Sequence, residues 1–373
     1  MSKILVLGAG GNAGINFSKA LNLAGRFEVF GVDSSNYFFQ QSIYARCYLS
    51  TSNCIEKKIR LINQICADHE IDFIHAQPDQ EVDFLTHHGH ELEAPCWPLR
   101  ITELEQFNNK LTCQQIWSGD IGAVLTSSLT DCLQNPETFE KIKSISGKVW
   151  VRAIRGAGSR AALPISTLEQ AKFWADYWVS NRGLAIEDFM LAEYLPGNEY
   201  AVQTLWADGQ LVASQARQRV EYFFGSIMPS GQSSTPSVAK TVHCREVYDT
   251  AYAAITTIEK RPNGIYCVDI KENQNKKLVP MEVNYGRFFT TSDFFASIGV
   301  NMPAMYCDLA TNKSTEIPTA IESITDSFYW VRGLDREPNL FKDVSSRTET
   351  PQLKPLAIEN PGAKKIKSVS QKL

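Results

Sequence analysis

Two carboxylates and an amide oxygen stand close together in residues 264–287, on two segments that are expected to be buried strands. Asp269 follows an apolar run, and Glu282 and Asn284 alternate with apolar residues. Side chains of a strand alternate between two faces, so Glu282 and Asn284 share one face. The polar residues 273–277 supply the turn between the strands. Hard oxygen ligands of this kind suit Mg²⁺ with bound phosphate oxygens, although an ordinary hairpin with a wet polar face would carry the same residues.

Arginines that could face an anion occur in two other predicted strands. Arg152 lies in strand 149–154 on a face that also carries apolar side chains, and an inward cation needs an anionic partner. In strand 211–219 the side chains of Arg217 and Arg219 share one face. These arginines could bind a phosphate or a carboxylate, or they could be surface residues paired with acids.

A short glycine-containing loop follows the first of these strands. Residues 155–160 are RGAGSR. Backbone amides freed by Gly156 and Gly158 and flanked by guanidiniums have the chemistry of a phosphate cradle, although a surface turn has the same composition. Asn108-Asn109-Lys110 precedes a helix predicted at 111–117 as a capping sequence, and Lys110 could serve either a ligand or the helix start alone.

The amino-terminal residues combine a strand, a glycine-rich turn and a helix. The apolar strand 4–7 is followed by residues 8–14, GAGGNAG, and then by apolar residues at helical spacing. A second strand at 28–32 ends in Asp33, near the place where a dinucleotide-binding fold keeps an acid for the ribose. The same turn also opens doubly wound domains that bind no dinucleotide, so NAD binding stays an alternative for this segment.

Composition limits the class of protein. A chain of 373 residues is long enough for two or three domains. The net charge of −4, with acids and bases interspersed, argues against a nucleic-acid partner. Nine cysteines form no CxxC pair, which favours reduced thiols and a cytoplasmic location. The initial apolar run is too short for a signal peptide, and no run approaches the roughly 18 residues that span a bilayer, so we expect no membrane partner.

Other segments complete the expected order of elements in the first part of the chain. Helix 55–69 leads to strand 72–75, and the loop 77–81 follows at the carboxyl end of that strand, where α/β sheets place ligands. Three histidines near the end of the next helix have a spacing that fits no common metal site, and we expect them to be solvated. They are His87, His88 and His90.

The remaining segments add a hairpin and several loops. We expect residues 119–126 to form a strand. Residues 208–209, Asp-Gly, are a hairpin signal between two predicted strands. Residues 225–237 are rich in Gly, Ser and Pro, and are expected to form a mobile functional loop. Residues 335–373 lose periodicity and are expected to end in a disordered basic tail.

Taken in order, these pieces resemble the ATP-grasp superfamily, and within it single-module ligases similar to the carbamoyl-phosphate-synthetase-type grasp. The specific motifs are EYLPGNEY at 193–200 and D…MEVN…R at 269–287, whereas GAGGNAG is less specific. The second motif ends NYGR, one residue longer than the Asn-Pro-Arg common in the family. The resemblance covers about residues 1–310.

The resemblance implies a fold of α/β and α+β type, divided into three parts. A doubly wound pre-ATP-grasp domain would occupy 1–100, and a two-lobed ATP-grasp domain would occupy 101–320. Its nucleotide lobe would lie at about 120–195 and its metal and substrate lobe at about 196–310. Residues 321–373 would be a carboxyl-terminal extension with a basic tail.

The resemblance also assigns roles to individual residues. ATP would be bound by Lys110, Arg152, Gly156, Gly158, Glu193, Leu195 and Glu199, with Glu193 and Leu195 at the adenine and Glu199 at the ribose. Asp269, Glu282 and Asn284 would hold Mg²⁺, for which Mn²⁺ could substitute. Arg287 would contact the terminal phosphate. We expect Arg217 and Arg219 to bind the acceptor carboxylate and the acyl-phosphate oxygens.

The resemblance implies an ATP-dependent ligase that phosphorylates a carboxylate, lets an amine attack the acyl phosphate, and releases ADP and phosphate. Its partners would be a small-molecule carboxylate and amine, and a homodimer is left open. Only one grasp module is present, so carbamoyl-phosphate synthesis, which takes two in the family, is not expected. Two alternatives stay open: an NAD(P)-dependent oxidoreductase that uses residues 8–14 and Asp33, and a non-catalytic nucleotide-binding protein.

Overall fold

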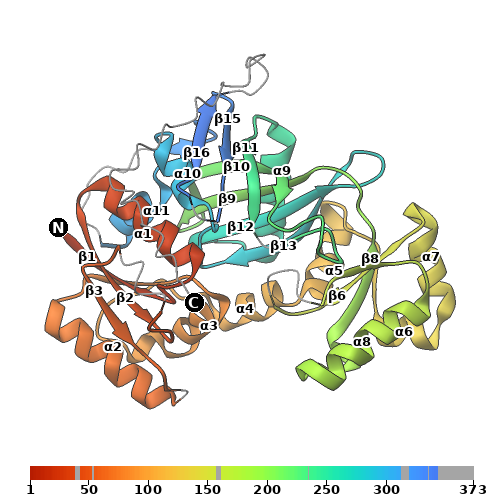
Figure 1. The fold of residues 1–373 in the computed structure, drawn as a ribbon, viewed down its shortest axis with the longest axis horizontal. Coiled ribbons are helices and arrows are strands. Elements are labelled where there is room, and N and C mark those ends of the chain that lie inside the picture. Colours follow the sequence, from red (N-terminus) through yellow and green to blue (C-terminus); the bar gives the residue numbers. More distant parts are fainter. Residues whose placement is uncertain are drawn as a thin grey trace, which may run out of the picture.

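The computed structural model describes residues 1–37, 43–52, 54–156, 161–233, 235–311, 319–334 and 336–342. This part of the chain is a mixed α/β structure with three β-sheets (Figure 1). The first sheet lies at one end of the molecule, a small sheet lies at the other end, and a large sheet lies between them.

The first sheet is built from the amino-terminal residues and is parallel throughout, in the order β3-β2-β1-β4. Its strands are β1 (Ser2–Leu7), β2 (Phe27–Asp33), β3 (Arg46–Leu49) and β4 (Phe73–Ala76), and its helices are α1 (Asn12–Ala24), α2 (Ile55–His69) and α3 (Asp79–His88). Apolar residues of α1 pack on one face of the sheet and those of α2 on the other. The predicted strands at 4–7, 28–32 and 72–75 and the helix at 55–69 are therefore confirmed to within two residues.

Asp33 braces the glycine-rich turn that follows β1. One carboxylate oxygen of Asp33 accepts a hydrogen bond from the Gly10 amide at 2.7 Å, and the other accepts one from the Ser35 amide at 3.0 Å. Gly8 has a left-handed backbone, and a Cβ there would lie 2.3 Å from the ring of Pro78. The glycine at position 8 therefore permits the loop after β4 to approach the turn closely.

The small sheet is antiparallel, in the order β5-β8-β6-β7. Its strands are β5 (Thr126–Ser128), β8 (Phe189–Glu193), β6 (Val149–Ala153) and β7 (Leu163–Ile165), covered by α6 (Leu129–Gln134), α7 (Pro136–Ser146) and α8 (Leu168–Arg182). The strand predicted at 119–126 is wrong except for its last residue. Helix α5 (Lys110–Asp120) continues instead, because buried Trp117 anchors it by donating to the Ala254 carbonyl at 3.0 Å.

The large sheet has the order β13-β12-β9-β10-β11-β15-β16, with β14 paired to β10. Its strands are β9 (Glu199–Ala207), β10 (Gln210–Tyr222), β11 (Pro236–Thr241), β12 (Gly264–Glu272), β13 (Leu278–Tyr285), β14 (Ala320–Ile321), β15 (Phe328–Val331) and β16 (Asn339–Lys342). The hairpin between β9 and β10 is confirmed, with φ of 51° at Asp208 and 85° at Gly209. Strand β16 lies in the stretch predicted to lack periodicity, because four residues at a sheet edge give little periodic signal.

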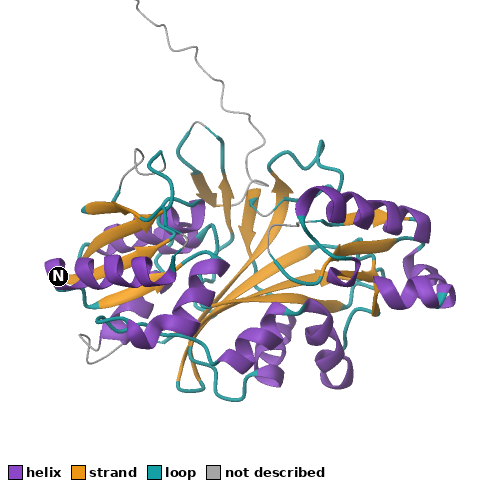
Figure 2. Ribbon diagram, turned by 90° about the horizontal axis from the view of Figure 1, so that it is seen from below, coloured by secondary structure: helices purple, strands orange, loops and turns teal. Residues whose placement is uncertain are grey.

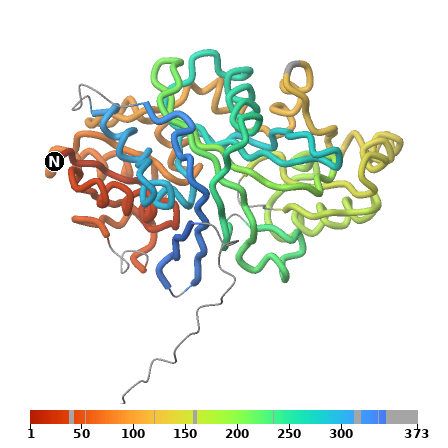
Figure 3. The backbone as a smooth tube through the Cα atoms, turned by 90° about the horizontal axis from the view of Figure 1, so that it is seen from above, coloured from red at the N-terminus to blue at the C-terminus, as the bar shows by residue number. Residues whose placement is uncertain are grey.

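Hydrophobic cores join the first sheet to the large sheet but leave the small sheet apart. Helices α10 (Ser292–Ser297) and α11 (Met302–Thr311) pack against α1, and α4 (Ile101–Asn108) and α9 (Arg245–Ile258) pack on the other side. Figure 3 shows the light blue segment that contains α10 and α11 lying beside the red amino-terminal segments. The small sheet has a core of its own. It meets the large sheet through a separate apolar cluster that includes Trp150, Leu195 and Val279.

Two 3-10 turns, Gly89–Glu91 and Ile186–Asp188, complete the described elements. Helices cover the outer sides of the sheets, and the long strands of the large sheet run between the two end units (Figure 2). Among the described helices, none combines the length and the apolar character needed to cross a membrane.

We expect Gly8→Ala to lower the free energy of unfolding by more than Gly147→Ala. Both glycines have a left-handed backbone, with φ of 70° and 77°, which costs an L side chain roughly 1–2 kcal/mol. At Gly147 a Cβ would meet nothing within 4 Å, whereas at Gly8 it would meet Pro78, and this overpacking adds about 1–3 kcal/mol. Urea unfolding measures both costs. Equal losses in the two variants would contradict the close contact with Pro78.

Candidate active site

A cavity of about 690 Å³ opens where the three sheets meet. Its floor is one face of β13, β12, β9 and β10, and its walls come from β6 and β8 of the small sheet, from residues 8–14, and from the loop after β4. A volume of this size is typical of small-molecule sites. Residues 77–80 of the loop predicted at a ligand-binding edge therefore do line a cavity, although the part from Asp79 onward is the first turn of α3 and not a loop.

The floor of the cavity is ordered by strand register into three rows of side chains that share one face. In antiparallel pairs, residues directly opposite point to the same side, about 5 Å apart. The middle row is Glu282, Asp269, Ala201 and Arg217. The outer row is Lys271, Glu199 and Arg219. The inner row is Asn284, Cys267, Gln203 and Gln215.

Glu282 is held by two cations at the end of the cavity nearest the small sheet. Arg152 of β6 donates a hydrogen bond to it, and the Nζ of Lys110 lies 3.7 Å away. Lys110 also donates to the Gly156 carbonyl at 2.6 Å. Burial opposes ionisation of Glu282, but Arg152 and Lys110 outweigh it and hold the pKa of Glu282 at about 2. Burial lowers the pKa of Lys110.

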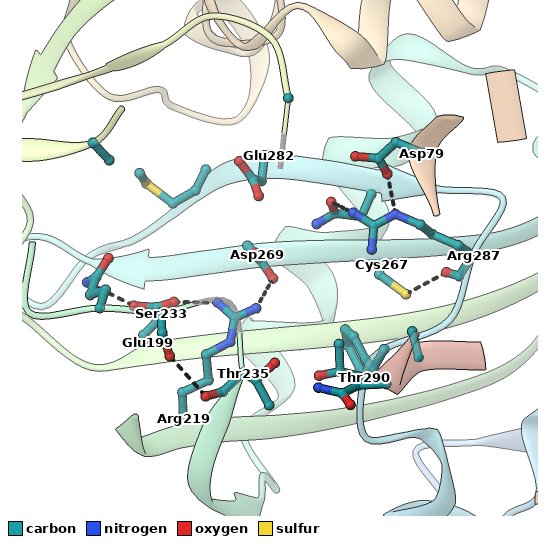
Figure 4. A pocket seen from close by; sticks show the side chains of 18 of the residues that line it. Asp79, Glu199, Arg219, Ser233, Thr235, Cys267, Asp269, Glu282, Arg287 and Thr290 are labelled. Carbon is teal, nitrogen blue, oxygen red and sulfur yellow. Dashed lines mark hydrogen bonds and ion pairs between the residues drawn. The ribbon is translucent and has the colours of Figure 1, made fainter. Parts of the chain in front are cut away.

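Arg219 bridges two acids on neighbouring strands (Figure 4). Its Nη2 donates to Asp269 at 2.7 Å, and its Nη1 donates to Glu199. Glu199 also lies 3.6 Å from the Lys271 ammonium and accepts from Gln232 at 3.2 Å. Burial raises the pKa of Asp269 despite Arg219, whereas at Glu199 the nearby cations overcome burial and lower the pKa. Arg219 is thus committed to acids of the protein in this structure.

Arg217 differs from Arg219 in having no carboxylate of its own. The side chain is 1% exposed and lies over the ring of Phe289, 4.5 Å from its centre. Among the described residues, none accepts a hydrogen bond from its Nε or Nη1. Burial and the charge of Arg219 lower the pKa of Arg217 to about 9. An arginine in this state is a strong binding site for an anion.

Arg287 joins the cavity to the amino-terminal unit. It donates to Asp79 at the start of α3, and its Nη2 donates to Asn284 at 2.5 Å (Figure 4). The next amide, of Phe288, donates to the Gln77 side chain at 2.9 Å. Gly286 has a φ of 65°, and this left-handed residue accommodates the longer NYGR ending. Arg287 therefore reaches the cavity beside Asn284 despite the extra residue.

Beside these ion pairs, the cavity continues as an apolar slot between the small and large sheets. Trp150, Ala162, Leu195 and Met281 line it, together with Glu193. Burial raises the pKa of Glu193. A flat aromatic ring would fit the chemistry of this slot, with Glu193 as a polar contact at its edge.

The structure brings most of the predicted site residues to this one cavity. Those that line it are Arg152, Gly156, Glu193, Leu195, Glu199, Arg217, Arg219, Asp269, Glu282, Asn284 and Arg287. Lys110 lies directly behind them, at the start of α5. The predicted capping of this helix is confirmed, because the Asn109 side chain accepts a hydrogen bond from the Thr112 amide at 3.0 Å. Gly158 lies outside the described residues.

Lys271, Asp79 and Gln232 line the cavity but were not predicted individually, although the last two lie in segments expected to be near a ligand or functional. Lys271 continues the period of two that carries Cys267 and Asp269, so the strand pattern could have indicated it. Asp79 and Gln232 make their contacts with residues far away in the chain, which no local pattern reveals.

The residues present fit a divalent metal only in combination with a ligand. Asp269 and Glu282 face each other on paired strands, with Asn284 in the next row. Within the described ranges, no three His, Cys, Asp or Glu side chains form a group that could hold a metal ion. Two carboxylates and an amide suit Mg²⁺, which keeps water or phosphate oxygens as its other ligands.

Of the three histidines, His87 and His90 are exposed and His88 is partly exposed at the end of α3.

Solved structures of several ATP-binding enzymes share this fold. A biotin carboxylase domain of 2-oxoglutarate carboxylase from Hydrogenobacter thermophilus, with MgADP and bicarbonate, is 14% identical, over 89% of this chain and 74% of that one, with a TM-score of 0.65. N5-carboxyaminoimidazole synthetase from Staphylococcus aureus, with ADP, is 12% identical. The match covers 88% of this chain and 82% of that one, with a TM-score of 0.64. L-amino acid ligase from Bacillus licheniformis is 12% identical. The match covers 89% of this chain and 80% of that one, with a TM-score of 0.64.

These neighbours are ATP-grasp enzymes, and the chain has their fold. The resemblance drawn from the sequence motifs is thereby confirmed at the level of the fold. No protein-family model matches the chain, and no curated protein sequence matches it. The identities of 12–14% carry the fold and not the reaction.

We expect Arg152→Ala to destabilise the protein most at neutral pH. The pKa of Glu282, about 2 in the fold, lies below its value of about 4.3 in an unfolded chain. The ionised form therefore stabilises the fold above about pH 4, and this contribution is lost as the pH falls toward 2. Without Arg152, burial raises that pKa and the contribution disappears. The expected cost is about 3–5 kcal/mol near pH 7 and less near pH 3.

Arg261→Ala is the matched control for this measurement. The Arg261 side chain is 72% exposed and pairs with Asp208 at 3.6 Å. Its loss should cost less than about 1 kcal/mol at every pH. A cost of Arg152→Ala that is the same at pH 3 and pH 7 in urea unfolding would show that Glu282 does not depend on Arg152.

Proposed function

We propose that this protein is an ATP-dependent carboxylate–amine ligase that works through an acyl phosphate. In this proposal residues 1–100 are a doubly wound pre-ATP-grasp domain, residues 101–320 are a two-lobed ATP-grasp domain, and residues 321–373 are an extension. The observation that carries the proposal is the pair of largely buried acids, Asp269 and Glu282, opposite each other on β12 and β13 and flanked by cations in the floor of a large cavity.

The nucleotide is proposed to lie across the junction of the small and large sheets. The adenine ring would occupy the apolar slot beside Glu193 and Leu195, and the ribose would meet Glu199. The phosphates would be bound by Lys110 and Arg152. The loop that contains Gly156 and Gly158 would cover them. The size of the cavity and the apolar character of the slot support this placement.

Asp269, Glu282 and Asn284 are proposed to hold Mg²⁺, with Mn²⁺ as a substitute. When bound, the metal would neutralise charge on the phosphates during transfer. The acids are already balanced by Arg152 and Arg219 in the ligand-free chain. Binding of metal and nucleotide would therefore exchange one set of counter-charges for another.

The protein's own residues would position the carboxylate for attack. Arg217 is proposed to hold it, since the guanidinium is buried and no described residue accepts from its Nε or Nη1. A carboxylate oxygen attacks the γ-phosphorus, ADP leaves, and an acyl phosphate forms. Arg287 and Arg219 would stabilise charge on the transferred phosphoryl group. Residues 232–235 would help keep water from the intermediate, since the described ones line the cavity.

The amine completes the proposed reaction. Its nitrogen attacks the acyl carbon, the C–N bond forms, the nitrogen loses a proton, and phosphate leaves with the former carboxylate oxygen. The substrates would be small molecules. One structural neighbour is a dimer, which supports a homodimer as part of the proposal.

The oxidoreductase alternative has less support. Its ribose-binding acid would be Asp33, but both oxygens of Asp33 already accept bonds from the Gly10 and Ser35 amides. It also gives no reason for the buried acids at Asp269 and Glu282. These two observations favour the ligase.

We expect Glu282→Gln to abolish ADP formation while the fold survives. The change removes a metal charge at nearly constant volume. The rate of ADP release with MgATP should fall more than tenfold, about 1.4 kcal/mol of barrier. The control is Glu246→Gln, the same change at an exposed position of α9, which should leave the rate unchanged. Retention of more than a tenth of the activity by Glu282→Gln would remove Glu282 from the metal site.

Arg217→Ala and Arg219→Ala should fail in different ways. Loss of Arg217 should leave ADP affinity nearly unchanged and slow carboxylate-dependent turnover. The slowing should correspond to a few kcal/mol of lost transition-state binding. Loss of Arg219 should weaken ADP binding and stability, because Glu199 and Asp269 lose their shared partner. Calorimetry with MgADP and steady-state kinetics separate the two effects. If Arg217→Ala weakened ADP binding and Arg219→Ala slowed only carboxylate-dependent turnover, the roles of the two arginines would be exchanged.

A further inference from the structure

The first turn of α1 faces the cavity without a capping side chain, and the hydrogen bond that Asp33 accepts from this turn comes from the Gly10 amide, before the helix. Gly11, Asn12, Ala13 and Gly14 all line the cavity. The first-turn amides of a helix have no acceptor within the helix, and they carry the positive end of its dipole. The cap residue, Gly11, has no side chain to accept from them, and the first turn of this 13-residue helix contains no acidic residue. Such an end binds anions.

Helix α3 also begins at the cavity, but it supplies its own negative charge. Its first turn contains Asp79 and Glu81. Asp79 is bound to Arg287, and Glu81 is bound to Lys58 at 2.6 Å. An anion that enters this end of the cavity would therefore be directed to α1 and away from α3.

Arg217 is an independent sign that this end of the cavity receives an anion. Its guanidinium is buried in the cavity wall with unused donors, a costly arrangement unless a ligand supplies the charge. The wall is continuous from Arg217 to α1. Arg217 lies over Phe289, and the carbonyl of the next residue, Thr290, accepts a hydrogen bond from Asn16 of α1.

We propose that the acceptor acid carries two anionic groups. The reacting carboxylate lies on Arg217, near the metal-binding acids, and the second anion, a carboxylate or a phosphate, lies at the amino end of α1. This rests on the proposed ligase function and names its substrate class. An amino acid fits less well, because an ammonium group would need a free acid there, and Asp79 is already paired.

The test compares acids with and without a second anionic group, using protein saturated with MgADP. Glutarate is titrated against pentanoate, and 3-phosphoglycerate against glycerate, by calorimetry. In at least one pair the member with the second anionic group is expected to bind at least tenfold more tightly. The pair that shows the preference identifies the second anion as a carboxylate or a phosphate. Equal affinities within both pairs overturn the inference.

Asn12→Asp tests whether the preference comes from α1. Asn12 is exposed and lines the cavity, so the isosteric change adds a negative charge to the first turn without repacking, and it favours the helix. The ratio of affinities for the two members of the acid pair should fall below threefold. Asn275→Asp, the same change at an exposed position in the β12–β13 turn, is the control and should retain it. A preference that persists in Asn12→Asp overturns the assignment to α1.

The experiment also separates this inference from the ligase proposal. Failure of the wild-type protein to bind MgADP contradicts the ligase proposal itself. Binding of MgADP, with equal affinity for both members of each acid pair, contradicts only the two-anion substrate.

Discussion

The close placement of two largely buried acids on neighbouring strands is the constraint on which the rest of the structure depends. Asp269 and Glu282 are direct cross-strand partners, and like charges so close in a poorly hydrated site repel strongly. The chain balances them with cations from elsewhere. Arg219 comes from β10 of the same sheet, whereas Arg152 comes from β6 of the small sheet. The second ion pair therefore fixes the small sheet, which has its own core, against the large one.

This arrangement explains how one set of residues can serve both the ligand-free chain and the proposed complex. In the free chain, acids and cations neutralise each other across the cavity. A metal ion would take over the acids, and phosphate groups would take over the cations, so none of these paired acids and cations loses its counter-charge in either state. Arg217 stands outside this exchange, because no acid of the described chain pairs with it. That difference is why we assign the substrate to Arg217 and not to Arg219.

Strand periodicity predicted which side chains of this site share a face. It could not predict which of them form ion pairs. The period of two placed Glu282 with Asn284, and Arg217 with Arg219, on shared faces, and the motifs supplied the fold. The sequence could not show that Arg219 is bound while Arg217 is free, because the partners lie up to 50 residues away. The wrong strand at 119–126 has a similar cause, since the contact that extends α5 is made with a residue 137 positions further along the chain. Local pattern fixes a face, and only tertiary contacts fix a partner.

The most direct test of the central claim is calorimetric titration of ADP at increasing Mg²⁺ concentration. If metal and phosphates replace the ion pairs of Asp269 and Glu282 together, each should favour the other's binding. The account predicts a dissociation constant for ADP that falls at least tenfold on saturation with Mg²⁺, which is about 1.4 kcal/mol of coupling, and no competition from NAD⁺. An ADP affinity that is independent of Mg²⁺, or displacement of ADP by NAD⁺, would contradict it.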